Sequence, residues 1–201
     1  MRAKKTETAI RKDQIINAAL DLIGSKGVQS LSIAGIAEQV GIVPSAIYSH
    51  FKGKEDILDE VLKFIKKRFL ENVTQVRKKT PKALDRLQLL LKKQAHMLNE
   101  NGAIPYVVFA DGIYTGNPER KAMVSEIIMI FLDMVQKIIE EGMQDGSIRE
   151  DVIPNSTAIM FIGMIMPIAI ILNLSEGLFD INEHIKKIWP VFYRCIAANN
   201  D

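Results

Sequence analysis

The fold is decided by residues 32–54, which read SIAGIAEQVGIVPSAIYSHFKGK. Apolar residues spaced three and four apart predict a short amphipathic helix that ends at Gly41. Three residues later, Pro44 opens a second short helix that runs to Phe51. Two short helices joined by a tight turn are typical of a helix-turn-helix. We therefore expect this motif from Ser32 to Phe51, with one face of its second helix in solvent.

Helical spacing extends along nearly the whole chain. Apolar residues three and four positions apart recur from Ile16 to Ile23 and from Ile181 to Ile196, and each set forms one stripe. Thr80-Pro81 and Asn117-Pro118 each place a capping side chain before a proline, which predicts a helix start. We find no convincing run of strands. The sequence therefore predicts an all-α fold of about nine helices.

The composition is that of a globular protein. Of 201 residues, 48% are hydrophobic and 25% are charged, which argues against a disordered chain. Cys195 is the one cysteine, so an internal disulfide framework is excluded, and we expect this side chain to be buried. The first nine residues lack the apolar core of a signal peptide. We expect an intracellular, cytoplasmic protein.

Charge is distributed unevenly. Residues 1–54 carry eight basic and four acidic groups, whereas residues 55–201 carry eighteen and twenty. This asymmetry is typical of a polyanion-binding head on a neutral body, although basic termini also occur on proteins that bind nothing. We expect residues 1–54 to form the helix-turn-helix domain and residues 55–201 a larger helical domain.

One stretch raises the question of a membrane span. Residues 152–175 hold no charge, but the unbroken apolar core covers only fifteen residues, 158–172, and Pro167 interrupts it. A span needs about twenty apolar residues. We expect instead a helix from Pro154 to Leu174 that is buried within the domain or in an oligomer interface. Membrane attachment remains an alternative, which detergent-free solubility would exclude.

The head resembles the DNA-binding head of the tetracycline-repressor (TetR) family. The rest of the chain matches that family only in length, helix count and the pattern from Gly142 to Asp151. The positions that carry the resemblance are Ala18, Ala19, Leu20, Leu22 to Gly27, Ser32, Ile36, Ala37, Gly41, Ala46, Tyr48, His50, Phe51, Lys54 and Glu55.

The resemblance implies that the head binds double-stranded DNA. Ser32, Tyr48, His50 and Lys54 would contact phosphates, and the residues facing the groove would be Val43, Pro44, Ser45 and Ser49. Taken singly, such a serine would be a helix cap, and such a tyrosine or histidine a packing residue. Val43 departs from the family, since a capping serine is common there. The second helix of the motif, from Pro44 to Phe51, holds no Arg, Asn or Gln. Apolar contacts with thymine methyls, or the shape of the DNA, would therefore contribute more to sequence recognition.

The resemblance also implies an effector site and a homodimer in the larger domain. As effector-pocket residues we expect Phe64, Met97, Tyr106, Phe109, Met123, Ile127, Phe131, Met134, Phe161 and Met164. Soft, adaptable side chains suit an apolar pocket, but they also serve as core filler. At the dimer interface we expect Ile159, Ile162, Met166, Ile170, Ile185, Trp189 and Phe192.

The resemblance points to a ligand-responsive repressor. Two heads about 34–36 Å apart would bind a pseudo-palindromic operator. An apolar effector would release the DNA by favouring a different distance between the two heads. An all-helical carrier or interaction module with an inactive head is the alternative. His50, His96 and His184 lack metal-ligand spacing, and no phosphate loop or nucleophile elbow is present. We therefore expect no catalytic residue, metal or cofactor.

Overall fold

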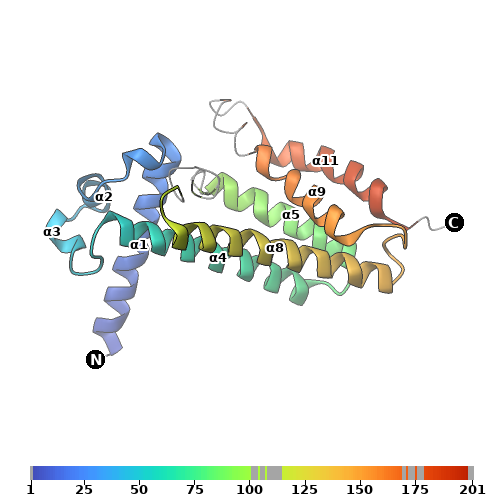
Figure 1. The fold of residues 1–201 in the computed structure, drawn as a ribbon, viewed down its shortest axis with the longest axis horizontal. Coiled ribbons are helices and arrows are strands. Elements are labelled where there is room, and N and C mark those ends of the chain that lie inside the picture. The colour runs from blue at the N-terminus through green and yellow to red at the C-terminus, as the bar shows by residue number, and fades with distance from the viewer. Residues whose placement is uncertain are drawn as a thin grey trace. The chain divides into compact units, whose positions relative to one another are not determined.

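The computed structural model describes residues 2–100, 104, 107, 115–168, 171, 175 and 179–198, with side chains from residue 7 onward. Across these residues it has eight α-helices, one 3-10 helix and an isolated bridge between Ile148 and Ala197, so the all-α prediction is confirmed (Figure 1). The helices are α1 (Arg2–Lys26), η1 (Val28–Ser30), α2 (Ile33–Val40), α3 (Pro44–Ile47), α4 (Lys54–Lys79), α5 (Ala83–Glu100), α8 (Pro118–Gln144), α9 (Pro154–Gly163) and α11 (Ile181–Ile196).

The chain folds as two compact units. The first unit is Met1–Lys67 with Asn101–Val124, and the second is Arg68–Glu100 with Ser125–Asp201. Helices α4 and α8 each contribute residues to both units.

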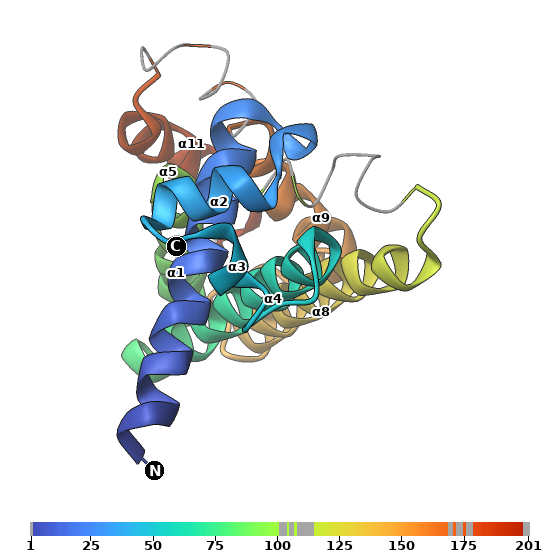
Figure 2. The same ribbon diagram turned by 90° about the vertical axis from the view of Figure 1, so that its left-hand side faces the viewer.

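The core of the first unit is built where α2 packs on α1 and α3 packs on α2 (Figure 2). Leu20 and Ile23 of α1, Ile36 of α2 and Ile47 of α3 are fully buried, and Phe51 is nearly so. The Lys12 ammonium lies 5.2 Å from the centre of the Phe51 ring. The helix-turn-helix is thus packed against α1, and this packing fixes which face of α3 is left outside.

Arg120, in the first turn of α8, binds the first two turns of α4. It is only 6% exposed. Its Nε and Nη1 donate to Asp59 Oδ1 and Glu55 Oε2, each at 2.6 Å, and its Nη2 donates to the Glu55 carbonyl at 3.1 Å. Desolvation alone would lower the pKa of Arg120, but the hydrogen bonds that it donates to both carboxylates outweigh this effect and raise the pKa. All three residues belong to the first unit, so this contact fixes the helix that follows the recognition segment.

In the second unit, α5 packs against α11. Ile185, Trp189 and Phe192 form the buried stripe of α11, and the Phe192 ring lies 5.6 Å from that of Phe161 on α9. The same chain therefore already covers these three residues, and their predicted place at a dimer interface stays a prediction. Amphipathic spacing indicates that a helix face is covered, and here the same chain covers it. Cys195 is not buried as expected, because it lies on the exposed side of α11.

The predicted helix from Pro154 to Leu174 is interrupted. Helix α9 ends at Gly163, and Met164 and Ile165 form a turn before helical structure resumes at Met166. Pro167 explains the break, because a proline has no N–H to bond the carbonyl four residues earlier and its ring clashes with it. Among the helices that the structure describes, none has the length and apolarity needed to cross a membrane.

The last turn of α8 and the residues that follow it contact several elements of the second unit. The Glu141 carboxylate accepts from Arg77 of α4 at 2.7 Å and from Arg86 of α5. The backbone N–H of Ile148 donates to the Gly142 carbonyl at 2.9 Å. A Cβ added at Gly142 would lie 2.5 Å from Ile148 Cδ1 and 2.9 Å from Ala83 Cβ, so only glycine fits there.

Gly142→Ala should therefore destabilise the protein by about 1–3 kcal/mol, since the new methyl overpacks a fixed contact. The measurement is urea unfolding followed by circular dichroism. Gly163→Ala is the matched control: it lies in α9 with nothing within 4 Å of the added Cβ, so it should be neutral or stabilising. Equal stability of the two variants would contradict this packing.

Candidate nucleic-acid interface

Local sequence fixes the shape of the helix-turn-helix. Ser32 caps α2, because its Oγ accepts from the Gly35 N–H at 3.1 Å. Gly41 ends α2 with φ 74°, in the left-handed region that glycine adopts readily. Val43 makes no side-chain cap, and Pro44 opens α3, as predicted from the missing serine. Helix α3 is shorter than predicted: it ends at Ile47 and not at Phe51.

Most of the predicted DNA-contacting residues lie on the outside of the head. Val43 is 64% exposed and Tyr48 is 59% exposed. The Ser49 hydroxyl donates to the Ala46 carbonyl at 2.7 Å, so its own proton is already bonded. The other predicted DNA-contacting residues that are exposed are Ser32, Pro44, Ser45 and Lys54.

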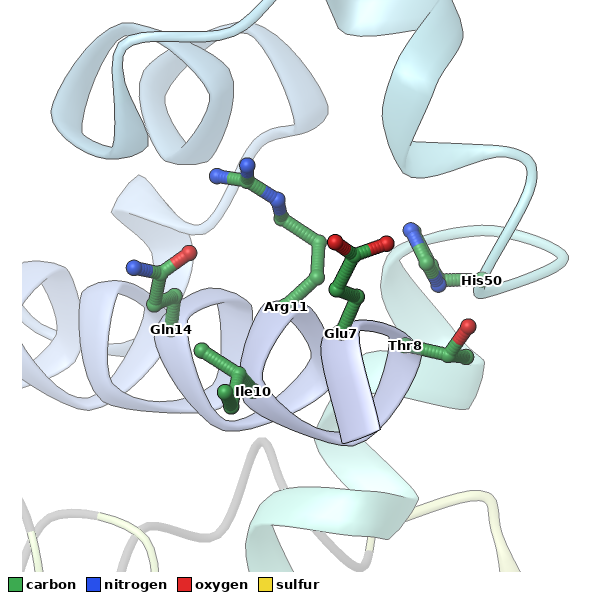
Figure 3. A pocket seen from close by; sticks show the side chains of 6 residues that line it. All are labelled: Glu7, Thr8, Ile10, Arg11, Gln14 and His50. Carbon is green, nitrogen blue, oxygen red and sulfur yellow. The ribbon is translucent and has the colours of Figure 1, made fainter. Parts of the chain in front are cut away.

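His50 is placed differently from the other predicted contacts. It is half-buried, and its Nδ1 is closed to solvent with no hydrogen-bond partner among the residues that the structure describes. It borders a cleft of about 470 Å³ against α1, into which Figure 3 shows Arg11 and Glu7 extending. Its Nδ1 is thus unavailable to a phosphate from solvent. The remaining lining residues of this cleft are Thr8, Ile10 and Gln14.

The predicted effector-pocket residues are divided between the two units. Phe64 and Met123 are half-buried in the first unit, and Tyr106 and Phe109 lie outside the described residues. The residues in the second unit are Met97, Ile127, Phe131, Met134, Phe161 and Met164, and all but the half-buried Met134 are buried.

Two contacts show which elements meet around these side chains. The Phe131 ring lies 5.1 Å from the Phe69 ring of α4. Met97 of α5 receives a weak hydrogen bond at 3.9 Å from the side-chain nitrogen of Asn72, which is also on α4. Near Met97, sequence reasoning missed Gln94, a buried polar residue. The signal was available, since it interrupts an apolar stripe. Across the described residues no cluster of side chains could hold a metal ion.

The remaining residues predicted at the dimer interface differ in exposure. Ile159 on α9 is exposed, Ile162 and Met166 are half-buried, and Ile170 lies outside the described residues. The described surface of α9 and α11 exposes other apolar residues that were not predicted, namely Met160, Val191 and Tyr193.

Known proteins match both parts of the chain. Residues 15–61 match the family described as "Bacterial regulatory proteins, tetR family", and residues 63–194 match "YsiA-like protein, C-terminal region". A fatty acid metabolism regulator protein of Bacillus subtilis strain 168 is 31% identical over 137 residues, which is 68% of this chain and 70% of that protein.

Solved structures agree with the fold described above. The crystal structure of FadR from Bacillus subtilis in complex with stearoyl-CoA is 26% identical with a TM-score of 0.74, over 90% of this chain and 96% of that one. The ketosteroid transcriptional regulator of Mycobacterium tuberculosis shares the fold at 15% identity, with a TM-score of 0.76 over 94% and 96% of the two chains. The resemblance seen in the head thus continues through the C-terminal helices, and the chain belongs to the TetR family of bacterial transcriptional regulators.

Proposed function

We propose that this regulator is a repressor that binds its operator as a homodimer and is released by a long-chain fatty acyl-CoA. The observation that carries the DNA-binding part is the outward face around α3, where Val43 and Tyr48 are mostly exposed. The effector class is supported by the Bacillus subtilis relative that regulates fatty acid metabolism and by the stearoyl-CoA in the similar structure.

The head provides groups suited to a DNA duplex. Ser32, Tyr48 and Lys54 would contact phosphates, because hydroxyl and ammonium groups bind phosphate oxygens and set the register of the protein. Val43, Pro44, Ser45 and Ser49 would face the base edges in the major groove. We keep residues 1–54 as the DNA-binding domain and residues 55–201 as the effector-binding and dimerisation domain.

The second unit suits an acyl chain. Its buried side chains on α5 and α8 include Met97, Ile127 and Phe131, which are apolar and partly flexible. An effector bound among these helices would shift the equilibrium between a DNA-binding and a released conformation. The size of this shift is set by the difference between its affinities for the two conformations.

Tyr48→Ala should weaken operator binding by about tenfold while leaving the free energy of unfolding within about 0.5 kcal/mol of the wild-type value, since the side chain is exposed. Fluorescence anisotropy with DNA flanking the protein's own gene measures this effect. Met129→Ala, an equally exposed apolar position on α8, should change neither quantity. Wild-type affinity in Tyr48→Ala would contradict the proposed DNA-binding face.

A carrier with an inactive head is the second candidate, because α3 contains no Arg, Lys, Asn or Gln. The salt dependence of DNA binding separates the two functions. A dimer that contacts phosphates should lose affinity steeply between 50 and 200 mM salt, by about a thousandfold or more for six contacts. A carrier should bind stearoyl-CoA and show no such DNA complex.

A further inference from the structure

Gln94 is a polar residue in the middle of the apolar face of α5. It is 1% exposed. Its neighbours one turn before it, Leu90 and Leu91, and one turn after it, Met97 and Leu98, are all buried. These five side chains share one side of the helix, because residues three and four apart lie above one another. A methionine at this position would continue the stripe without a polar group.

Among the described residues, the carboxamide of Gln94 has no hydrogen-bond partner. Both Nε2 and Oε1 are closed to solvent and make no hydrogen bond within the part of the chain that the structure describes. Buried side-chain amides are nearly always bonded, because leaving them unpaired is unfavourable. An unpaired carboxamide among apolar side chains therefore lowers the stability of the ligand-free protein. A bound ligand would supply the missing hydrogen-bond partner.

A second carboxamide approaches the same place from α4. The Nδ2 atom of Asn72 has Met97 Sδ at 3.9 Å, and a thioether is a weak acceptor. Met97 is three residues from Gln94, hence on the same side of α5. Phe69, three residues before Asn72, packs its ring on Phe131 of α8 at 5.1 Å between centroids. All of these residues belong to the second unit, and the two contacts link α4 to α5 and α4 to α8 close to both amides in the sequence.

We propose that Gln94 is the polar contact of the effector site and that its Nε2–H donates to the carbonyl oxygen of a bound acyl thioester. The assignment rests on the proposed function, since it takes the effector to be an acyl-CoA. The apolar side chains around Gln94 would bind the alkyl chain, and the carboxamide would place the thioester. Its Oε1 could then accept from an N–H group farther along the ligand, and the Asn72 side-chain N–H could donate to a C=O group. A ligand amide offers both groups.

Two probes and two variants test the assignment. The probes are stearoyl-CoA and S-octadecyl-CoA, a thioether in which the carbonyl oxygen is replaced by hydrogens. The variants are Gln94→Met, which keeps the volume, and Gln88→Met, which makes the same change at a half-buried position of α5. Calorimetric titration of the full-length proteins gives the affinity of each pair.

Gln94→Met should weaken stearoyl-CoA binding by about tenfold to a hundredfold, and Gln88→Met should not. Wild type should bind the thioether more weakly by a similar factor, whereas Gln94→Met should bind both probes nearly equally, as expected when both changes remove one hydrogen bond. Without ligand, Gln94→Met should raise the unfolding midpoint by about 2–4 °C, because an unpaired amide has been removed.

Several outcomes would overturn the assignment. Wild-type affinity of Gln94→Met for stearoyl-CoA, or continued discrimination between the two probes, would overturn it while leaving the proposed effector intact. A lower unfolding midpoint of ligand-free Gln94→Met would do the same, because it would show that Gln94 is already bonded without an effector. If wild type binds neither probe, the proposed effector itself fails, and the assignment fails with it.

Discussion

Val191→Glu is expected to separate the proposed homodimer and abolish operator binding. Val191 is 52% exposed on α11, and Cys195, one turn later, is exposed as well. Ile159 and Met160 are exposed on α9, which packs on α11 through Phe161 and Phe192. We propose that these exposed side chains, on two helices that contact each other, contribute to the two-fold contact.

A glutamate at Val191 would enter such a contact twice, because a two-fold interface uses the same patch of both subunits. Burying two unpaired carboxylates is strongly unfavourable, so the dimer dissociation constant should rise by about a hundredfold or more. A single head makes half of the contacts, and operator binding should be lost at concentrations that saturate wild type.

Analytical ultracentrifugation measures the first effect and fluorescence anisotropy the second. Met129→Glu is the control, since Met129 is 63% exposed on α8 and the same charge there should leave both quantities unchanged. A Val191→Glu protein that sediments as wild type and binds DNA normally would place the dimer contact elsewhere.

Arg120→Met should lower both the stability of the protein and its operator affinity, because Arg120 positions the start of α4. The guanidinium makes three bonds to Glu55 and Asp59, and its loss would free the turn that begins at Lys54. Because both carboxylates reach solvent, they would be rehydrated, and the destabilisation should be about 1–3 kcal/mol, below the value for a fully buried pair. Operator affinity should fall by about tenfold, as the head loses its fixed orientation on α4.

Thermal unfolding measures the change in stability, and fluorescence anisotropy measures the change in operator affinity. Arg120→Lys should be intermediate, because lysine keeps the charge but not the planar fork. Lys137→Met, which breaks an exposed ion pair with Asp133 on the same helix, should be nearly neutral. Stability and DNA affinity equal to wild type in Arg120→Met would show that this contact does not position α4.

The helix-turn-helix could be predicted from sequence because its signals are local. Gly41 ends one helix by its own backbone conformation, Pro44 starts the next, and Ser32 caps the first. None of these depends on a distant contact. The end of α3 was predicted less well, since Tyr48 continues the helical backbone for one residue but the regular helix stops at Ile47.

Other features depend on long-range partners that a sequence does not specify. The stripe of α11 predicts a covered face, but whether α5 or a second subunit covers it is decided by the fold. Arg120 appears as an ordinary charged residue at a helix start, yet its partners Glu55 and Asp59 lie more than sixty positions earlier. Gln94, in contrast, could have been found from its pattern, because its neighbours three and four positions away are apolar.

The bond from the Ser49 hydroxyl to the Ala46 carbonyl limits which bases this serine could recognise. A hydroxyl has a single hydrogen, and here it is used in the turn that follows α3, so only the oxygen lone pairs remain for DNA. In the major groove they match the exocyclic amino groups of adenine and cytosine, whereas guanine O6 and N7 and thymine O4 are acceptors and would repel them. In the proposed complex, Ser49 would thus favour base positions that present an amino group.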